Sequence, residues 1–181
     1  AEEYSMAAQE LYYLFKEATG LKLTFVSSNE VEYTSNAKFI YLGNSDLSAG
    51  FNVDLDALGS QGFVIKTKGQ SIFIIANPQG VLYGVYEFLN ETLSFETYSK
   101  EIYTLETGVT ELALPNLDLV QVPDIEYRIA FSGAQYSDEV SRRRMRTQNM
   151  GDLIVNGGSA HNMLDVIVPY ETYQKSNVKS F

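Results

Sequence analysis

The fold is decided by residues 62–93, which read GFVIKTKGQSIFIIANPQGVLYGVYEFLNETL. Residues 62–68 and 71–76 are rich in β-branched and aromatic side chains, and the Gly-Gln pair between them favours an antiparallel hairpin. Residues 71–76 are apolar on both faces, which is typical of a strand in the middle of a sheet. The Asn-Pro pair at 77–78 predicts a helix start, because Asn can cap a helix and Pro suits its first turn.

The residues after this pair repeat apolar side chains at the period of a helix, which predicts a helix packed against the sheet. Its apolar face consists of Val81, Leu82, Val85, Phe88, Leu89 and Leu93. A second helix is predicted over residues 3–19, where the same period recurs and Gly20 is placed to end it. Each helix has one apolar stripe, so each is expected to lie on a core.

Shorter elements are predicted in the rest of the first half. Residues 21–26 alternate apolar and polar side chains, the period of a half-buried strand, and residues 38–42 predict another short strand. Residues 45–60 show no clear period and are predicted to form a loop with a helical turn. These patterns together predict an α+β domain over residues 1–115, in which helices pack on a mixed sheet.

The order of elements changes after residue 115. A proline-punctuated linker is predicted over 116–124, followed by a strand at 125–131, a basic helix at 136–150 and a further short strand. This β-α-β order differs from the hairpin pattern upstream. We therefore expect a second domain to begin after the linker and to occupy residues 125–181.

The charge balance argues against a polyanionic partner. The sequence contains 13 Lys and Arg against 23 Asp and Glu, a formal net charge of -10, whereas nucleic-acid contacts need clustered cations. Arg142, Arg143, Arg144 and Arg146 are the exception, and Asp138 precedes them at the spacing of a helical ion pair. A solvated helix face is the preferred interpretation of this cluster, and a phosphate site is the alternative. No nucleic-acid partner is expected.

Neither a metal site nor a cofactor is expected. The chain has no cysteine, which removes thiolate ligands and nucleophiles, and His161 is its single histidine. The metal pattern His-Glu-x-x-His, the phosphate loop Gly-x-x-x-x-Gly-Lys and the hydrolase pattern Gly-x-Ser-x-Gly are missing from the sequence. No apolar run approaches the roughly 20 residues that span a bilayer, so no membrane partner is expected either.

Four segments taken together resemble a known family. They are the helix ending in Thr19-Gly20, then Ile40-Tyr41-Leu42-Gly43, Gly62-Phe63-Val64-Ile65 and Gly80-Val81-Leu82-Tyr83-Gly84-Val85-Tyr86-Glu87-Phe88-Leu89. This order resembles the N-terminal domain of DUF4838 proteins, which are similar in architecture to α-glucuronidases and family 20 β-hexosaminidases. The resemblance implies that the α+β domain precedes a (β/α)8 barrel, and that residues 125–181 are the first βα segment of an incomplete barrel.

The resemblance also suggests two substrate-binding residues. Arg128 falls in the expected first barrel strand, where an arginine of family 20 hexosaminidases holds sugar hydroxyls, and a planar fork of donors suits that task. A structural ion pair is the alternative for Arg128. His161 falls in the expected loop at the barrel mouth, where ligand contact and an incidental position are both open. No catalytic residue is expected, because the paired carboxylates come from later barrel strands.

The functional expectation follows from this resemblance. The chain is expected to be a noncatalytic N-terminal accessory domain of an exported, glycoside-hydrolase-like protein, which meets carbohydrate through the parent enzyme and packs against a downstream barrel of the same chain. The 13 tyrosines and 10 phenylalanines keep a stand-alone carbohydrate-binding module open, because aromatic rings stack on sugar faces. A protein-interaction domain is the third possibility.

Overall fold

The computed structural model describes residues 4–129 and 138–148. Its centre is a four-stranded sheet in the order β1-β3-β2-β6. The strands are β1 (Ile40–Leu42), β2 (Phe63–Lys68), β3 (Ser71–Ala76) and β6 (Asp118–Gln121). β1 runs parallel to β3, whereas β2 runs antiparallel to both of its neighbours, so the sheet is mixed, as the sequence predicts.

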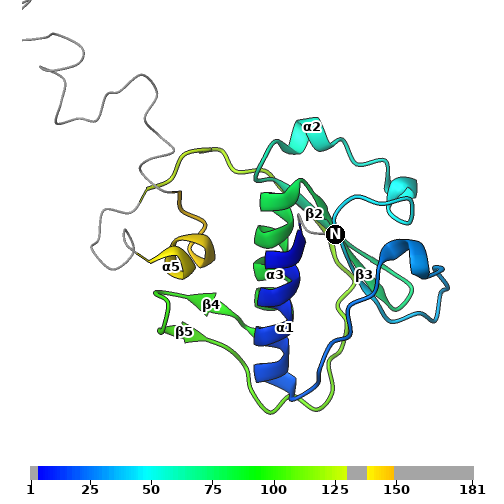
Figure 1. Cartoon of the computed structure of the whole chain (residues 1–181), viewed down its shortest axis with the longest axis horizontal. Coiled ribbons are helices and arrows are strands. Elements are labelled where there is room, and N and C mark those ends of the chain that lie inside the picture. The colour runs from blue at the N-terminus through cyan, green and yellow to red at the C-terminus, as the bar shows by residue number, and fades with distance from the viewer. Residues whose placement is uncertain (1–3, 130–137, 149–181) are drawn as a thin grey trace, which may run out of the picture.

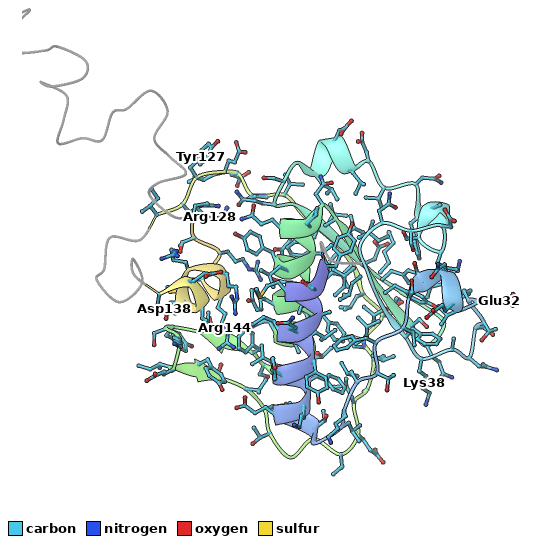
Figure 2. All side chains as sticks on the ribbon, viewed as in Figure 1. Glu32, Lys38, Tyr127, Arg128, Asp138 and Arg144 are labelled. Atoms are coloured by element: carbon cyan, nitrogen blue, oxygen red, sulfur yellow. The ribbon has the colours of Figure 1, made fainter. Side chains whose placement is uncertain are left out.

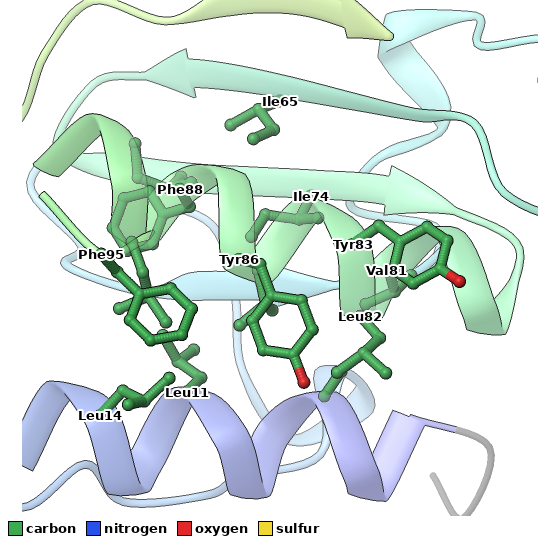
Figure 3. Close-up of a cluster of buried hydrophobic side chains, with 14 of the residues drawn as sticks. Leu11, Leu14, Ile65, Ile74, Val81, Leu82, Tyr83, Tyr86, Phe88 and Phe95 are labelled. Atoms are coloured by element: carbon green, nitrogen blue, oxygen red, sulfur yellow. The ribbon is translucent and has the colours of Figure 1, made fainter. Parts of the chain in front are cut away.

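Two long helices cover one face of this sheet. α1 (Ser5–Thr19) and α3 (Pro78–Leu93) lie side by side in Figure 1, where α3 packs on β2 and β3 and α1 packs on α3. Figure 3 shows apolar side chains such as Leu11, Phe88 and Ile74 in the core that the two helices and the sheet enclose. The two helices predicted from the apolar period are confirmed, and the molecule is an α+β structure.

β2 and β3 form the predicted hairpin, with Gly69 at its turn in the left-handed region at a φ of 60°. β3 lies between β1 and β2, as its two apolar faces predict. Its side chains alternate between two cores, because successive residues of a strand point to opposite faces. Ile72 and Ile74 belong to the core under the helices, and Phe73 and Ile75 belong to the core on the opposite face.

The opposite face of the sheet is covered by the chain between β1 and β2 and the residues before β1. This region contains the 3-10 helices η2 (Ser28–Glu30) and η3 (Ala49–Phe51) and the short helix α2 (Leu55–Leu58). Aromatic rings dominate the contact, and the ring of Tyr41 stacks on that of Phe73 with centroids 4.4 Å apart. The predicted loop with a helical turn at 45–60 is therefore confirmed.

Helix α3 approaches the sheet closely because it has glycine where the strands pass beneath it. A Cβ on Gly84 would lie 2.5 Å from Cγ2 of Ile74, and a Cβ on Gly80 would collide with the carbonyl oxygen of Gly62. Asn77 precedes the helix, but its side chain donates to the carbonyls of the α2 region instead of capping.

Two predicted strands are wrong within the described residues. Residues 21–26 form neither strand nor helix; Phe25 is 59% exposed and packs beside the ring of Tyr12, while Leu23 packs on the helix core. Residues 125–129 are also not strand, and the rest of that predicted strand lies outside the described residues. Alternation alone does not make a strand, because a strand is stabilised by pairing with a neighbour.

Residues 116–124 contain an element that the sequence analysis missed. β6 pairs with β2 through the register Val64↔Val120 and forms an edge of the main sheet. Part of the predicted linker thus belongs to the sheet of the α+β unit. The predicted domain boundaries stay a prediction. A helix was predicted at 136–150. Within the described residues of this range, the helix α5 spans Glu139–Arg144 and is therefore shorter than predicted.

The small hairpin of β4 (Glu96–Thr97) and β5 (Tyr103–Thr104) lies beside α5 in Figure 1. The backbone N–H of Lys100, in the turn of this hairpin, donates to Oγ of Ser141 at 2.8 Å. Within the described ranges, none of the helices is both long and apolar enough to cross a membrane. Neither the short strand predicted after residue 150 nor any barrel segment there lies within the described residues.

Candidate functional site

A cleft of about 530 Å³ lies where the sheet and α3 meet the chain that follows β6. The residues that line it are Gln61, Phe63, Tyr83, Val120, Gln121, Val122, Pro123, Asp124, Arg128, Met145 and Arg146. Apolar and polar side chains therefore line the same hollow. This volume lies within the range of small-molecule sites, and the mixture of apolar and polar lining is typical of them.

Arg128 lies in the wall of this cleft, where its guanidinium bonds to protein oxygens. Nε donates to the carbonyl of Arg146 at 3.0 Å, Nη1 to the carbonyl of Ile125 at 2.6 Å and Nη2 to Oε1 of Gln61 at 2.6 Å. Three of the five N–H groups of an arginine are thereby used to hold the chain in place. Arg128 therefore has a structural role, as the predicted alternative of an ion pair supposes, but its partners are neutral oxygens and not a carboxylate. Contact of Arg128 with a sugar stays a prediction.

Gln61 and Gln148 fix the same wall from two sides. Gln61 is 5% exposed and donates through Nε2 to the carbonyl of Glu126 at 2.7 Å. The side-chain oxygen of Gln148 accepts from the backbone N–H of Arg128 at 2.7 Å, and the Gln148 N–H donates to the Arg128 carbonyl at 2.8 Å. The segment that contains Arg128 is therefore bonded both to the sheet domain and to the residues after α5.

Arg146 closes the cleft on the side of α3 through an ion pair. Its Nη2 lies 2.6 Å from Oε2 of Glu87, and Oε1 of Glu87 accepts from Nε2 of Gln121 at 2.9 Å. The guanidinium also lies over the ring of Phe63, 5.8 Å from its centroid. The carboxylate of Glu87 is thus engaged by an arginine and an amide.

Tyr83 presents a buried phenol at the cleft. The residue is 3% exposed, and its hydroxyl accepts from Nε2 of Gln79 at 2.8 Å. Burial raises the pKa of Tyr83 above its usual value, although Gln79 and the nearby Arg128 and Arg146 act in the opposite direction. The phenol is therefore neutral at physiological pH and can serve as a hydrogen-bond donor.

A second polar cluster joins α1, α3 and α5 around Glu10. The carboxylate of Glu10 lies 2.9 Å from Nη2 of Arg143 and 2.9 Å from Nε of Arg144, and it accepts from the Tyr86 hydroxyl at 3.1 Å. Figure 2 shows Arg144 in the space between α5 and α1. Burial opposes ionisation of Glu10, but the hydrogen bonds and charges of both arginines outweigh it and lower its pKa. Burial and the adjacent Glu10 raise the pKa of Tyr86.

The described residues offer little for acid-base or metal chemistry in the cleft. Among the lining residues in the described ranges, Asp124 is the sole carboxylate. No group of three or more His, Asp and Glu residues in these ranges is arranged to hold a metal. A glycosidase needs two carboxylates across the bond that it cleaves, and the cleft does not supply that pair.

The structure places the predicted residues unequally. Arg128 lines the cleft, and His161 lies outside the described residues. The arginine cluster is not a solvated helix face, because Arg143, Arg144 and Arg146 pair with carboxylates of α1 and α3. The interpretation as a solvated helix face is wrong. The charge and spacing of an arginine run can be read from the sequence, but carboxylate partners that lie far away in the sequence cannot.

Glu10 and Gln61 were missed by the sequence analysis. Glu10 is 5% exposed and lies on the buried stripe of α1 with Ala7 and Leu14. An acidic residue in register with an apolar stripe is the signal that could have identified it, because a buried carboxylate requires a partner. Gln61 carries no comparable signal in its sequence neighbourhood.

Comparison with known proteins bears on the first part of the chain. No curated protein matches the sequence. Residues 1–88 match the family model described as Glycosyl hydrolase family 67 N-terminus. The matched range contains α1, the four-stranded sheet except β6, and most of α3. The first half of the chain is therefore similar to the N-terminal domain of α-glucuronidases, an accessory domain of glycoside-hydrolase-like proteins.

Proposed function

We propose that the chain is a noncatalytic N-terminal accessory domain of an exported glycoside-hydrolase-like protein, and that it supports a downstream catalytic barrel. The observation that carries this proposal is the match of residues 1–88 to the family 67 N-terminal domain. The resemblance to DUF4838 proteins describes the same arrangement of a small α+β domain before a barrel. Carbohydrate is the expected partner of the parent enzyme, and no cofactor is part of the proposal.

The geometry of the cleft supports a noncatalytic role. Glycoside hydrolysis generally requires two carboxylates about 5 to 10 Å apart. Asp124 lines the cleft without a second carboxylate among the described lining residues, and Glu87 is occupied by Arg146 and Gln121. The cleft is therefore better suited to shaping one side of a neighbouring active site than to cleaving a bond itself.

A hydrolysis assay tests this function. The 181-residue chain is expected to release no product from a panel of aryl glycosides, including an aryl glucuronide. A longer protein that carries the downstream barrel should hydrolyse one of them, and removal of residues 1–115 should reduce its activity or its stability. Turnover by the 181-residue chain that Asp124→Asn abolishes would contradict the proposal. Export is checked by fractionating cells that express the natural gene.

A carbohydrate-binding module is favoured as a second candidate by one surface. The rings of Tyr12 and Tyr13 lie 5.5 Å apart and those of Tyr12 and Phe25 lie 5.9 Å apart, while Tyr13 and Phe25 are 61% and 59% exposed. Exposed rings of this kind can stack on the apolar faces of sugars. This surface belongs to α1 and the residues after it.

Titration calorimetry against neutral oligosaccharides distinguishes the two candidates. A binding module should show micromolar to millimolar affinity that is lost in Tyr13→Ala and Phe25→Ala. Tyr98→Ala is the matched control, because Tyr98 is also a half-exposed aromatic residue at 51% but lies on the β4–β5 hairpin. Absence of binding to every oligosaccharide leaves the accessory role alone.

A further inference from the structure

We propose that Glu10 and Glu87 form a two-point receptor on the α+β unit for the arginine-bearing segment 143–146, and that docking of this segment builds one wall of the cleft. The inference rests on the proposed support function, since it identifies the part of the chain that the domain holds. It assigns a role to carboxylates that hydrolysis does not use.

The first point of the receptor is Glu10, which holds two arginines at once. Its side chain is 7% exposed, and those of Arg143 and Arg144 are 20% and 12% exposed, so all three charged groups are largely removed from water. The hydroxyl of Tyr86 fills a further acceptor position of the carboxylate. A buried carboxylate favours an arginine partner more strongly than an exposed carboxylate does, because leaving its charge unpaired in the protein interior is costly.

The second point is Glu87, which lies next to Tyr86 in α3 and binds Arg146. The side chains of Glu87 and Arg146 are 15% and 28% exposed, and Gln121 of β6 orients the carboxylate. Arg146 follows the end of α5 and has a positive φ of 55°. The chain therefore turns at Arg146, just after the residues that Glu10 binds. Two anchors on one rigid helical layer fix the direction of the segment as well as its position.

Contacts with the β4–β5 hairpin and Phe95 before it complete the receptor around these anchors. The guanidinium of Arg144 lies 5.9 Å from the ring centroid of Phe95 and 5.4 Å from that of Tyr103. Ser141 accepts from the backbone of Lys100, whose side chain lies 3.4 Å from Asp138 at the start of α5. The β4–β5 hairpin therefore supports the segment from the side opposite to the cleft.

Two residues of the docked segment 143–146 also line the cleft. Met145 and Arg146 line the cleft directly, and Arg146 accepts the bond from Nε of Arg128, which lines it too. Gln148 holds the backbone of Arg128 on the same segment. If the segment leaves the receptor, the wall that contains Arg128 loses these supports, so an occupant of the cleft and the docked segment stabilise each other.

Residue-resolved hydrogen exchange of the 181-residue chain tests the proposal. The backbone N–H groups of Arg128 and Gln148 report the wall, and those of Ile65 and Ile74 report the sheet. In Glu10→Gln, exchange at Arg128 and Gln148 is expected to accelerate on the order of 100-fold, because breaking a largely buried ion pair is strongly unfavourable. Exchange at Ile65 and Ile74 follows global unfolding and should accelerate less, by no more than about 30-fold. Glu91→Gln, one turn beyond Glu87 on α3 and exposed, is the matched control and should resemble the wild type.

A double variant in the segment protects the test against loss of the fold. Arg143→Gln with Arg144→Gln changes no residue of the α+β core and should accelerate the same two amides, and far-UV circular dichroism checks that the core remains folded. NMR titration of the Glu10 carboxyl should show a pKa below the usual 4.5 in the wild type and a higher pKa in the double variant. Unchanged exchange at Arg128 and Gln148, or an unchanged Glu10 pKa in that variant, would overturn the proposal. Either outcome leaves the aryl-glycoside assay to judge the support function separately.

Discussion

At the scale of single residues, the molecule is organised by a few charged and polar side chains that lie in apolar surroundings. Glu10 is the most informative, because it occupies the buried stripe of α1 and is 5% exposed. It is tolerated there because two arginines and a tyrosine complete its hydrogen bonds. Such a residue links the stability of the fold to pH.

Glu10→Gln is expected to lower the free energy of unfolding at pH 7 by about 2 kcal/mol, somewhat less than a fully buried pair, because both arginines retain some exposure. The Glu10 pKa is lowered from 4.5, so its contribution is complete above pH 4.5 and is lost as the pH falls through the folded-state pKa. Urea unfolding at several pH values should show the two proteins converging in acid. A difference that grows as the pH falls would contradict this assignment.

Arg128→Lys is expected to destabilise the cleft wall although it keeps the charge. A planar guanidinium reaches oxygens of Ile125, Arg146 and Gln61 at once, and an ammonium cannot do so. The expected loss is about 1–2 kcal/mol, from hydrogen bonds to a charged group. Thermal unfolding measures it, and Lys68→Arg, on the far end of β2, serves as the reverse-exchange control. Stability equal to that of the wild type would show that the three bonds are dispensable.

At the scale of elements, α3 packs closely on the β2–β3 hairpin. Gly80 and Gly84 stand one helical turn apart on the face that meets the strands. The absence of side chains there allows the helix backbone to reach the sheet. The apolar stripe of the helix and the alternate side chains of β3 then pack in one core cluster.

Gly80→Ala is expected to destabilise the protein by about 1–3 kcal/mol, despite the higher helix propensity of alanine. The added methyl would meet the backbone oxygen of Gly62, which has no rotamer by which to move aside. Chemical denaturation provides the measurement. Gly50→Ala is the control, because a Cβ there would meet no atom within 4 Å. A stabilised Gly80→Ala variant would show that the layers can separate at little cost.

The sequence predicted the elements that carry their own turn or period signal, and it failed where only a distant partner decides whether a strand forms. The β2–β3 hairpin and α3 follow from turn chemistry and period, and both were predicted. Residues 21–26 alternate like a strand, yet they pair with no strand of the described sheet. β6 was missed because its pairing with β2 joins residues more than fifty positions apart in the register Val64↔Val120.

The candidate site was harder to predict than the fold for the same reason. Arg128 was singled out through a family resemblance, and the structure places it in the cleft wall with a structural role. The arginine cluster was noticed but assigned to solvent, since Glu10 and Glu87 lie far upstream of it. The region of His161 lies outside the described residues, so its predicted ligand contact stays a prediction.

At the scale of the whole molecule, β6 decides where the α+β unit is complete. It covers the outer edge of β2, and Leu117 just before it is 7% exposed in the core under the helices. The side chain of Thr67 donates to the carbonyl of Pro115 at 2.7 Å and so draws the approaching chain to the sheet. The sheet of the α+β unit therefore includes residues past 115, and we expect its stability to depend on them.

A chain shortened to residues 1–115 is expected to unfold roughly 10 °C below one shortened to residues 1–129, because it loses the buried Leu117 and a strand. It should also associate as its concentration rises, since the bare edge of β2 can pair with another copy. Calorimetry and light scattering on the two proteins measure these effects. Equal melting temperatures and equal masses would show that β6 is dispensable.

The hairpin followed at once by α3 has a consequence for biosynthesis. Within residues 63–93, β2 pairs with β3 and α3 packs on both strands, so this stretch can begin to condense soon after it leaves the ribosome. Until β6 has been synthesised, the outer border of β2 remains uncovered in a nascent polypeptide. Slow translation of the intervening stretch would prolong that exposed interval, during which the uncovered backbone groups can pair with another chain.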